Sequence, residues 1–593
     1  MEIKVGKKNG SVESFDEAKV ERAIRLASDR IGRKLNPVEI RRVIGLIEDE
    51  ITQTFVHVSE MHKIVCRVLK ETYPDVAQSY QNFRDYKLTY VKDLEKLFEE
   101  SKNTLKYGDR ENANFDSALI STKGSLLRGY LTKLLYTKYY LHKDEAEATR
   151  LGTIYIHDMR DMVMQSFNCD LFDIGEVLRG GFEMANIRYK EPNSVLSALQ
   201  VTGDVTLSAS AQQFGGFTLA ELDRVLVPYA KKTMENARAE FDSFMEGTAE
   251  QREKFAWHKL ERELEQGFQS LELKLNTVPS SRGDFAFTTI SFAAMPKDAT
   301  DEEKRIQRLI CSVILRTRKN GHGGVPVVFP KLVYLYAKAQ HENDPEQQKL
   351  FEEALECSAH TMYPDYLAID SDYGTVSRVY KESGKITSPM GCRAYLSPWK
   401  DPETGEYVTI GRANLGAVSL NLPLIWLVAE YEHPEAVEDH FYKLLDKNLL
   451  MIRNFLKRRY DVIRDTPCST NPLAFTQGGL YKGHKRPDEK IGDLVNYMTA
   501  SFGVTALNEL CQFAKKHTIR ESNQFAVDVV QYIYDKVQEF KKEDGYLYAL
   551  YGTPSESLAG TQAEQIRKYL ESIGRKEEAY NFPTYVTNSF HQL

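Results

Sequence analysis

The chain has 593 residues, of which 42% are hydrophobic and 27% charged, and its formal net charge is -7 at pH 7. These are ordinary values for a globular protein, and the acidic balance, with a pI near 6.1, argues against a nucleic-acid-binding surface. A mean hydropathy of -0.45 and the lack of a long apolar run predict no membrane span. The N-terminus has no apolar stretch of the signal-peptide kind, so we expect a cytoplasmic protein.

The seven cysteines are scattered along the chain, and no two of them form a Cys-x-x-Cys pair. This distribution argues against a disulfide framework and against a zinc ribbon. The sequence therefore predicts isolated thiols, most of them structural, and no metal site within these residues.

The first ninety residues predict a β-hairpin followed by helices. Lys8-Asn9-Gly10 is a turn signal between two short strands, and Asp16 stands where the N-cap of the next helix belongs. Two more amphipathic helices are expected at about residues 38–54 and 59–73, the second with Ser59 as its candidate cap. Lysines at such a turn suit a polyphosphate ligand, although any surface hairpin can look this way.

A longer pattern runs through this region, and it resembles the ATP-cone, the regulatory nucleotide-binding domain at the front of many ribonucleotide reductases. The resemblance covers about residues 1–93. It implies that the domain binds ATP or dATP, with Mg, and switches the enzyme on or off, the lysines being natural partners of phosphate. The residues that carry the pattern and are expected at the nucleotide are Lys7, Lys8, Gly10, Glu13, Phe15, Asp16 and Lys19.

Asp93 to Lys102 is polar and charged, as in a linker helix, and from about Ser101 onward the chain has no Gly/Pro/Ser-rich linker and no internal repeat. This suggests one large catalytic domain over residues 94–593. Short β-branched runs alternate with longer helical patterns, as in a parallel or mixed sheet wrapped by helices, and we expect a single large α/β barrel. The expected strands include residues 152–157, 287–292, 325–329 and 418–422, and the expected helices include 219–240, 301–316 and 438–459.

One cysteine, Cys392, lies in a segment punctuated by Pro389, Gly391 and Pro398, which predicts a loop with the thiol at its tip. A thiol so placed can reach a reacting atom. Taken alone, the residue is equally compatible with the more common case of a small buried hydrophobe.

A second cysteine, Cys169, follows Asn168 in a strand-like apolar run. Neighbours in an ideal strand point to opposite faces, so a bulge or a strand end is needed for both to reach one pocket. The alternative is a core asparagine beside a buried thiol. Further along, a glycine-bounded turn carries Asn414 into a buried strand, where it either orients a substrate hydroxyl or caps a turn.

A hydroxyl-rich loop at residues 466–472 contains Ser469 and Thr470. Such a loop can present backbone N–H groups to phosphate at a helix start, so we expect these residues to hold the substrate's phosphates. The alternative is a simple turn.

Several of these segments together, in this order, are similar to the anaerobic (class III) ribonucleoside-triphosphate reductases. The similarity spans essentially residues 101–593 and implies a ten-stranded α/β barrel with a central finger loop, of the glycyl-radical-enzyme type. The segments that carry it are Ile156-His157-Asp158, Phe167-Asn168-Cys169, Gln212 to Gly216, Met390 to Arg393, Gly411 to Gly416 and Gly552 to Glu556.

The resemblance also implies a mechanism. Cys392 matches the finger-loop thiol that becomes a radical and removes the 3′-hydrogen of a ribonucleoside triphosphate, with Cys169 as its partner thiol. Asn168 and Asn414 match positions that orient the ribose hydroxyls or formate. Formate is the expected reductant, although thioredoxin stays open, and the expected partners are a radical-SAM activase and further copies of the chain, in a homodimer or a larger oligomer.

The family's radical glycine and four-cysteine zinc site are absent from this sequence, whose last cysteine is Cys511. We expect both in a C-terminal domain beyond the printed residues, without which the chain cannot store a glycyl radical. Two alternatives are another glycyl-radical enzyme, such as a relative of pyruvate formate-lyase, and a non-catalytic nucleotide sensor. The Cys-Cys pair typical of that lyase is missing at Cys392, and the cone also argues against it.

Overall fold

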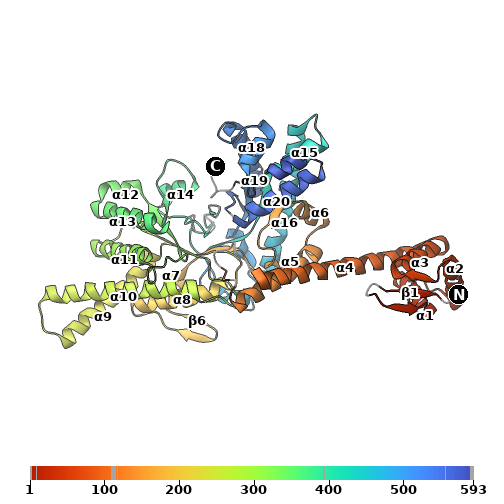
Figure 1. Ribbon diagram of the computed structural model, residues 1–593. Helices are drawn as coiled ribbons and strands as arrows, with labels where there is room; N and C mark the ends of the chain where they lie inside the picture. Colours follow the sequence, from red (N-terminus) through yellow and green to blue (C-terminus); the bar gives the residue numbers. More distant parts are fainter. Residues whose placement is uncertain are drawn as a thin grey trace. The chain divides into compact units, whose positions relative to one another are not determined.

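The computed structural model describes residues 3–7, 10–107, 115–116, 118–391, 394–554 and 556–587 (Figure 1). The chain divides into two compact units, residues 1–103 and 104–593, and each is described by itself. Within the described residues, no helix combines the length and the apolar character needed to cross a membrane.

The N-terminal unit is a small three-stranded sheet with helices. Strand β1 (Lys4–Gly6) pairs antiparallel with β2 (Val12–Ser14) and parallel with β3 (Phe55–His57), which confirms the predicted hairpin. Its apolar core lies among the helices, where Ile24, Val43 and Val65 are buried. The helices are α1 (Glu17–Arg30), α2 (Pro37–Glu50), α3 (Val58–Thr72) and the start of α4 (Pro74–Tyr107).

The helix caps of this unit match the sequence in one case of two. The Asp16 carboxylate accepts from the backbone N–H of Ala18 at 3.0 Å, as predicted for an N-cap. The prediction for Ser59 was wrong, because α3 begins one residue earlier, at Val58, with His57 in the cap position and no side-chain cap.

The large unit is built on one sheet of nine strands, in the order β11-β10-β9-β8-β5-β12-β13-β14, with β4 also paired to β12. Strands β11, β10, β9, β8 and β5 run parallel to one another, and so do β12, β13 and β14. The two sets are antiparallel to each other and meet where β5 pairs with β12. The strands are β4 (Ile154–Ile156), β5 (Cys169–Phe172), β8 (Phe217–Leu219), β9 (Thr288–Phe292), β10 (Lys331–Tyr336), β11 (Asp365–Ala368), β12 (Arg412–Asn421), β13 (Thr499–Thr505) and β14 (Leu547–Gly552).

This sheet differs in detail from the expected barrel. Ten strands were expected, whereas the described residues give nine, and no pairing joins β11 to β14 among them. The predicted strand at residues 325–329 is irregular, and β10 begins only at Lys331. The glycine-rich turn before it and the ring of Pro326, which lacks an N–H, keep that segment out of the ladder.

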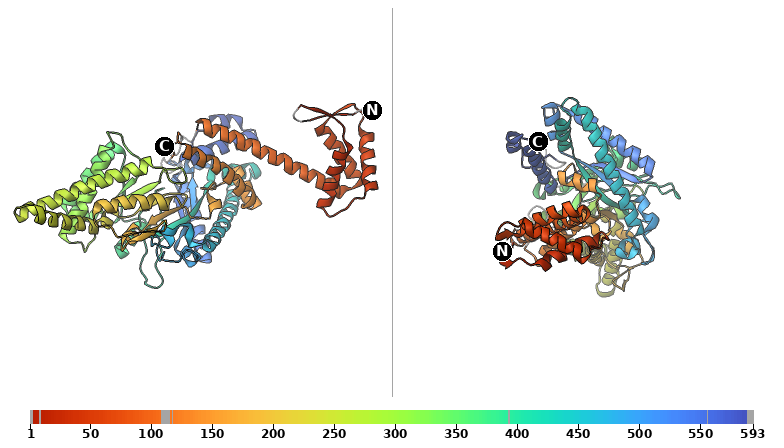
Figure 2. Two further views of the ribbon diagram at one scale, coloured as in Figure 1. Left: turned by 90° about the horizontal axis from the view of Figure 1, so that it is seen from below. Right: turned by 90° about the vertical axis from the view of Figure 1, so that its right-hand side faces the viewer.

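Helices surround the strands, which occupy the middle of the unit (Figure 2). Parallel neighbours need long crossover connections, and helices supply them here. The predicted helices at 219–240, 301–316 and 438–459 are confirmed as α9, α11 and α16, each extending further at its C-terminal end. The helices are α5 (Ile120–Tyr139), α6 (Lys143–Leu151), α7 (Ile174–Leu178), α8 (Val195–Ser210), α9 (Leu222–Phe244), α10 (Ala249–Thr277), α11 (Asp301–Asn320), α12 (Lys338–Asn343), α13 (Pro345–Thr361), α14 (Thr375–Ser383), α15 (Leu422–Glu432), α16 (Val437–Asp465), α17 (Pro472–Phe475), α18 (Leu507–Lys515), α19 (Asn523–Asp544), α20 (Glu556–Ser572) and α21 (Lys576–Asn581).

Strands β4 and β5 lie one after the other along the same edge of β12. Ile156 of β4 pairs with Val418, and Cys169 of β5 pairs with Asn414. Between them the chain leaves the sheet over residues 157–168, which include the 3-10 helix η1 (Met162–Met164). We call residues 157–168 the excursion. It interrupts the pairing along β12, in the middle of the sheet, at the place where the candidate site residues are found.

Candidate active site

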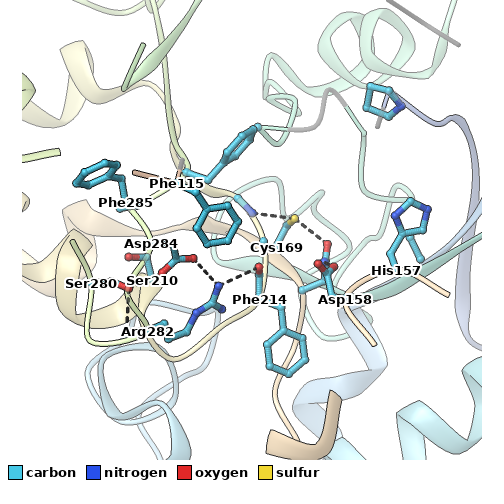
Figure 3. A pocket seen from close by; sticks show the side chains of 18 of the residues that line it. Phe115, His157, Asp158, Cys169, Ser210, Phe214, Ser280, Arg282, Asp284 and Phe285 are labelled. Carbon is cyan, nitrogen blue, oxygen red and sulfur yellow. Dashed lines mark hydrogen bonds and ion pairs between the residues drawn. The ribbon is translucent and has the colours of Figure 1, made fainter. Parts of the chain in front are cut away.

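A cavity of about 220 Å³ lies where the excursion leaves the sheet (Figure 3). The starting ends of β5, β8, β9 and β10 form one part of its wall. Because β14 runs in the opposite direction, its finishing end forms another part. The polar and charged side chains that line it include those of His157, Asp158, Asn168, Cys169, Arg282, Asp284, Lys331 and Thr553.

Cys169 is the first residue of β5, and Asn168 comes just before the strand begins. This is the strand end that the sequence required for both side chains to reach one pocket. The Cys169 thiol donates to Asn168 Oδ1 at 2.7 Å, and Sγ accepts from the backbone N–H of Gly216 at 3.1 Å. The sulfur is only slightly exposed, yet it lines the cavity. Its hydrogen-bonding geometry is therefore fixed on two sides.

Two glycines make room for this thiol. A Cβ atom on Gly215 would lie 2.5 Å from Cys169 Sγ, and a Cβ atom on Gly216 would lie 3.2 Å from the backbone nitrogen of Gly391. Both distances are shorter than ordinary van der Waals contact. The Gly-Gly pair therefore allows the thiol and the segment of Gly391 to approach the same wall.

Asn414 is brought next to Cys169 by strand pairing, but its side chain serves the sheet. Its Oδ1 accepts from the backbone N–H of Gly416 at 2.8 Å, and its Nδ2 donates to Ser501 Oγ at 2.6 Å. These bonds stabilise an irregularity in the β12–β13 pairing. Its backbone carbonyl accepts from the N–H of Asn168 at 2.8 Å, so Asn414 positions the site residue rather than lining the cavity.

Cys392 lies outside the described residues, but both flanks of its segment are described. Gly391 lines the cavity, while Met390 and Ala394 pack with Cys169 in one small apolar cluster. The backbone N–H of Met390 donates to the carbonyl of Ala394 at 2.9 Å, as in a tight loop. We call residues 388–399 the finger segment. Its described parts reach the cavity that contains Cys169.

The titratable groups of the cavity have shifted pKa values. Burial raises the pKa of Asp158 to about 6, with Asp161 adding to the shift. Burial lowers the pKa of His157 to about 4, so this imidazole is neutral at pH 7. Its Nε2 lies 2.8 Å from Ser419 Oγ, which in turn lies 2.6 Å from Thr553 Oγ1. A hydrogen-bonded row therefore joins the excursion to the end of β14.

The N-terminal unit brings several of the predicted nucleotide residues together. Glu13 accepts from Lys19 at 2.7 Å and lies 3.2 Å from Lys7. One carboxylate therefore joins a lysine that follows β1 to a lysine of α1. Gly10 has a φ of +83°, which suits glycine in the turn. Lys8 lies outside the described residues. Of the other two predicted residues, Asp16 caps α1 and Phe15 packs against the apolar core.

Comparison with known proteins agrees with this geometry. The family model described as anaerobic ribonucleoside-triphosphate reductase matches residues 111–592, and the one described as ATP cone domain matches residues 3–88. The chain belongs to the anaerobic ribonucleoside-triphosphate reductases. It is 30% identical to the reductase of Haemophilus influenzae over 606 residues, which span 99% of this chain and 81% of that one. It is 32% identical to the reductase of Salmonella typhimurium over 458 residues, 76% of this chain and 61% of that one.

The fold is also that of a solved reductase. The crystal structure of the anaerobic ribonucleotide reductase from Thermotoga maritima in complex with dATP and CTP superposes with a TM-score of 0.57 and 16% sequence identity. The superposition covers 86% of this chain and 82% of that chain. The α/β fold expected from the sequence is therefore confirmed as the reductase fold, apart from the strand count.

Sequence reasoning missed part of the reductase cavity. Arg282 donates to Asp284 at 2.6 Å and also to the carbonyl of Gln213, and Lys331 begins β10. Arg282 and Asp284 belong to residues 278–287, a Pro-, Ser- and Gly-containing stretch directly before a buried strand. That placement is a usable signal, because polar loops at strand ends commonly carry functional side chains.

The structure places Ser469 and Thr470 elsewhere. They belong to the 3-10 helix η2 (Cys468–Thr470) and line a separate cavity of about 720 Å³, together with Gln477 and Lys485. This cavity shares no lining residue with that of Cys169. The expectation that this loop holds the substrate's phosphates at the thiol site has no support in this placement.

Proposed function

We propose that the large unit reduces ribonucleoside triphosphates to deoxyribonucleoside triphosphates in the cavity around Cys169, and that nucleotides bound to the N-terminal unit regulate it. The observation that carries the proposal is the Cys169 thiol, held as a hydrogen donor in a cavity that the finger segment also reaches. Replacing a 2′-hydroxyl by hydrogen needs a hydrogen donor and a site that excludes water from a reactive intermediate.

Formate is the reductant that we assign. In the overall reaction, the ribonucleotide, formate and one proton give the deoxyribonucleotide, carbon dioxide and water, the 2′-hydroxyl leaving as the water. The two electrons come from formate. Arg282 and Lys331 bring positive charge to the cavity, which suits this anion and the substrate's phosphates. Asn168 supports the thiol through its amide oxygen. Asn414 supports Asn168 through its backbone.

We assign Cys392 as the residue whose thiyl radical removes the 3′-hydrogen of the substrate. In this family a glycyl radical, formed by a radical-SAM activase, supplies the oxidising equivalent. The described residues contain no group of three His, Cys, Asp or Glu side chains arranged for a metal, so no step is assigned to the family's zinc site.

For the triphosphate we assign the loop between β14 and α20 rather than Ser469 and Thr470. Thr553 and Pro554 line the cavity, and the 17-residue helix α20 begins at Glu556. The N–H groups at a helix start, with the partial positive charge of the helix dipole, stabilise phosphate. Thr553 is also the last member of the hydrogen-bonded row from His157.

In the N-terminal unit, Lys7 and Lys19 are the groups that we assign to the phosphates of ATP or dATP, with Mg. Glu13 forms ion pairs with both lysines and so keeps them close together. We further propose that the chain acts in the cytoplasm as a homodimer or a larger oligomer, with deoxynucleotide effectors at a second site.

The catalytic proposal is tested by anaerobic formation of dCTP from CTP with full-length protein, activase, S-adenosylmethionine, formate and ATP. Cys392→Ala and Cys169→Ala are each expected to abolish turnover, because each removes a thiol that hydrogen transfer requires. Cys66→Ala, in the N-terminal unit, is the matched control and should keep wild-type turnover. Full activity in Cys392→Ala, or turnover that does not depend on formate, would contradict the scheme.

The regulatory proposal is tested by calorimetric titration of ATP. Lys19→Ala should weaken ATP binding by about tenfold, because one charge-assisted phosphate contact is worth somewhat more than about 1 kcal/mol. Lys63→Ala removes an exposed lysine of α3, whose ion pair within the described residues is with Glu60, and should leave the affinity unchanged. Equal affinities for the Lys19→Ala variant and the wild type would remove Lys19 from the nucleotide site.

A further inference from the structure

We propose that Asp158 is a positioning residue for Cys169: it orients the Asn168 amide so that the amide oxygen faces the thiol and keeps it in the S–H form. This inference rests on the proposed role of Cys169 in hydrogen transfer. It assigns a function to a carboxylate that the proposed reaction does not otherwise use.

Asp158 lies where the chain leaves the sheet after β4. Its φ is +53°, a left-handed conformation that aspartate and asparagine adopt more readily than most other residues. Asn168 stands at the other end of the excursion. Asn168 Nδ2 donates to Asp158 Oδ2, so one hydrogen bond joins the two ends of the excursion. The backbone strain at Asp158 is therefore located at a residue whose side chain contacts the site.

Hydrogen-bonding rules turn this contact into a constraint on the thiol. An ionised carboxylate only accepts hydrogen bonds, so the amide of Asn168 must turn its NH₂ group toward Asp158. The amide oxygen then faces Cys169 Sγ at 2.7 Å, and this oxygen can only accept. The sulfur must carry its hydrogen to make that bond. A thiolate would instead meet the lone pairs of the oxygen.

A second contact of the sulfur adds to this constraint. The backbone N–H of Gly216 donates to Sγ at 3.1 Å, on the side provided by the glycine wall. With one acceptor and one donor, the S–H bond has a defined direction. A thiol, unlike a thiolate, has a hydrogen atom to donate, which is what the proposed reaction needs.

The charged groups around Asp158 come from two segments. Arg160 and Asp161 belong to the excursion, and Arg282 belongs to the segment before β9; the neutral His157 is the adjacent residue. Burial and Asp161 raise the pKa of Asp158 to about 6, while Arg160 and Arg282 oppose that rise. Above pH 6 the carboxylate therefore imposes the amide orientation, and below it the protonated acid can also donate, which removes the constraint.

The test uses Asp158→Asn and Asp158→Gly in full-length, unactivated protein. Both residues tolerate a φ of +53°, so the backbone is kept while the obligate acceptor is lost. The rate of Cys169 alkylation by iodoacetamide is measured against pH by peptide mass spectrometry. We expect the midpoint of this profile to fall by about one pH unit in both variants, because the freed amide can turn its NH₂ group to the sulfur and stabilise the thiolate.

The matched control is Asp161→Asn, which removes a neighbouring carboxylate of the excursion that contacts Arg160 and not the Asn168 amide. The pH midpoint of Cys169 alkylation in this variant should equal that of the wild type. Reading the midpoint rather than the plateau separates a change of ionisation from a change of access. Thermal unfolding of each variant shows whether the fold is kept.

Turnover provides a second readout. Wild-type activity should fall as the pH drops through about 6, and this fall should be weaker in Asp158→Asn, which has a lower kcat but a nearly unchanged KM for CTP. Alkylation midpoints equal to that of the wild type in both folded variants would overturn the proposal. If the wild type fails to reduce CTP with formate, the proposed function fails, while the alkylation profiles still decide the role of Asp158.

Discussion

Strands β5 and β8 have a cavity at each end, and the two cavities differ in chemistry. At the starting ends lie the thiol of Cys169, the amide of Asn168 and the glycine wall. At the finishing ends lies a larger cavity of about 710 Å³, where Asp173 follows β5 and Glu221 follows β8. In the first cavity directed hydrogen bonds hold a thiol, whereas the described lining of the second has no cysteine and contains buried or paired carboxyl groups.

The reason lies in the direction of the strands. Because β12 and β14 run opposite to β5, Ala417 of β12 and Thr553 after β14 line the first cavity. The first cavity therefore receives side chains from both parts of the sheet, which allows a small polar network to form. The second receives carboxylates and Arg224, with a Glu221–Arg224 separation of 3.6 Å. One sheet thus has the Cys169 thiol at one end of β5 and β8 and the buried carboxyl group of Glu221 at the other.

The largest effect is expected from filling the glycine wall of the first cavity. In Gly215→Ala the new methyl group would lie 2.5 Å from Cys169 Sγ and 3.0 Å from Asn168 Nδ2, so both groups must move. A misplacement of about 1 Å commonly costs on the order of 100-fold in rate, and we expect a loss of at least that size in dCTP formation.

The matched control is Gly124→Ala in α5, where a Cβ atom meets nothing within 4 Å. This variant should keep its activity and gain slightly in stability, because alanine is the better helix former. Gly215→Ala turnover within about threefold of the wild type would show that hydrogen transfer tolerates a displaced thiol, contrary to the usual sensitivity of rate to geometry.

The next effect concerns a buried arginine that holds the finger segment against the sheet. Arg412 is buried on β12 and donates to the carbonyls of Ser397, in the finger segment, at 2.8 Å and Tyr497 at 2.9 Å. A longer contact of 3.4 Å reaches the carbonyl of Val408, which lines the second cavity. Burial lowers the pKa of Arg412 to about 10, so it stays charged at neutral pH.

In Arg412→Met these buried carbonyls lose their donor, and each unmet group costs about 1 to 3 kcal/mol. We therefore expect a loss of about 3 kcal/mol in the free energy of unfolding, measured by urea denaturation. Arg486→Met, at an exposed site, is the control and should change stability little. An Arg412→Met variant as stable as the wild type would mean that the carbonyls of Ser397 and Tyr497 do not depend on this donor.

Much of this organisation was predictable, and the failures have physical causes. The alternation of short apolar runs with helical patterns indicated the α/β fold, and the Asp16 cap followed from local chemistry. The segment at 325–329 has strand-like composition, but Pro326 lacks the donor that a ladder needs. The strand count and the break between β4 and β5 depend on pairing partners far apart in the chain, which a local pattern does not contain.

The site was predicted in the same uneven way. Asn168 and Cys169 were expected to need a strand end, and they lie at one. The role of Asp158 depends on a contact across the excursion, which no spacing rule indicates. Ser469 and Thr470 have suitable chemistry for phosphate, but composition does not say which cavity a loop faces. Function was therefore best predicted where local geometry and chemistry coincide.

The smallest effect is expected at the second cavity, where Glu221 tests its charged character. Burial raises the pKa of Glu221 to about 7 from 4.5, with Arg224 opposing the rise. The folded state therefore keeps a proton that the unfolded state has lost, and stability falls as the pH rises from about 4.5 to about 7. Glu221→Gln removes this fall. Relative to the wild type, the free energy of unfolding of Glu221→Gln should be about 2 kcal/mol higher at pH 8 than at pH 5. A tenfold difference in proton affinity between the folded and unfolded states corresponds to about 1.4 kcal/mol, and part of the fall lies below pH 5.

Glu406→Gln is the matched control, because Glu406 lines the same cavity but is paired with Lys385 at 2.7 Å. That ammonium group lowers the pKa of Glu406, so its contribution to stability is lost as the pH falls rather than as it rises. Because that loss lies below about pH 4.5, the urea midpoint of Glu406→Gln should keep a nearly constant offset from the wild type between pH 5 and pH 8, whereas that of Glu221→Gln should rise relative to the wild type. If Glu221→Gln also follows the wild-type pH dependence, the carboxylate of Glu221 is solvated, and the second cavity lacks the buried carboxyl group that we assign to it.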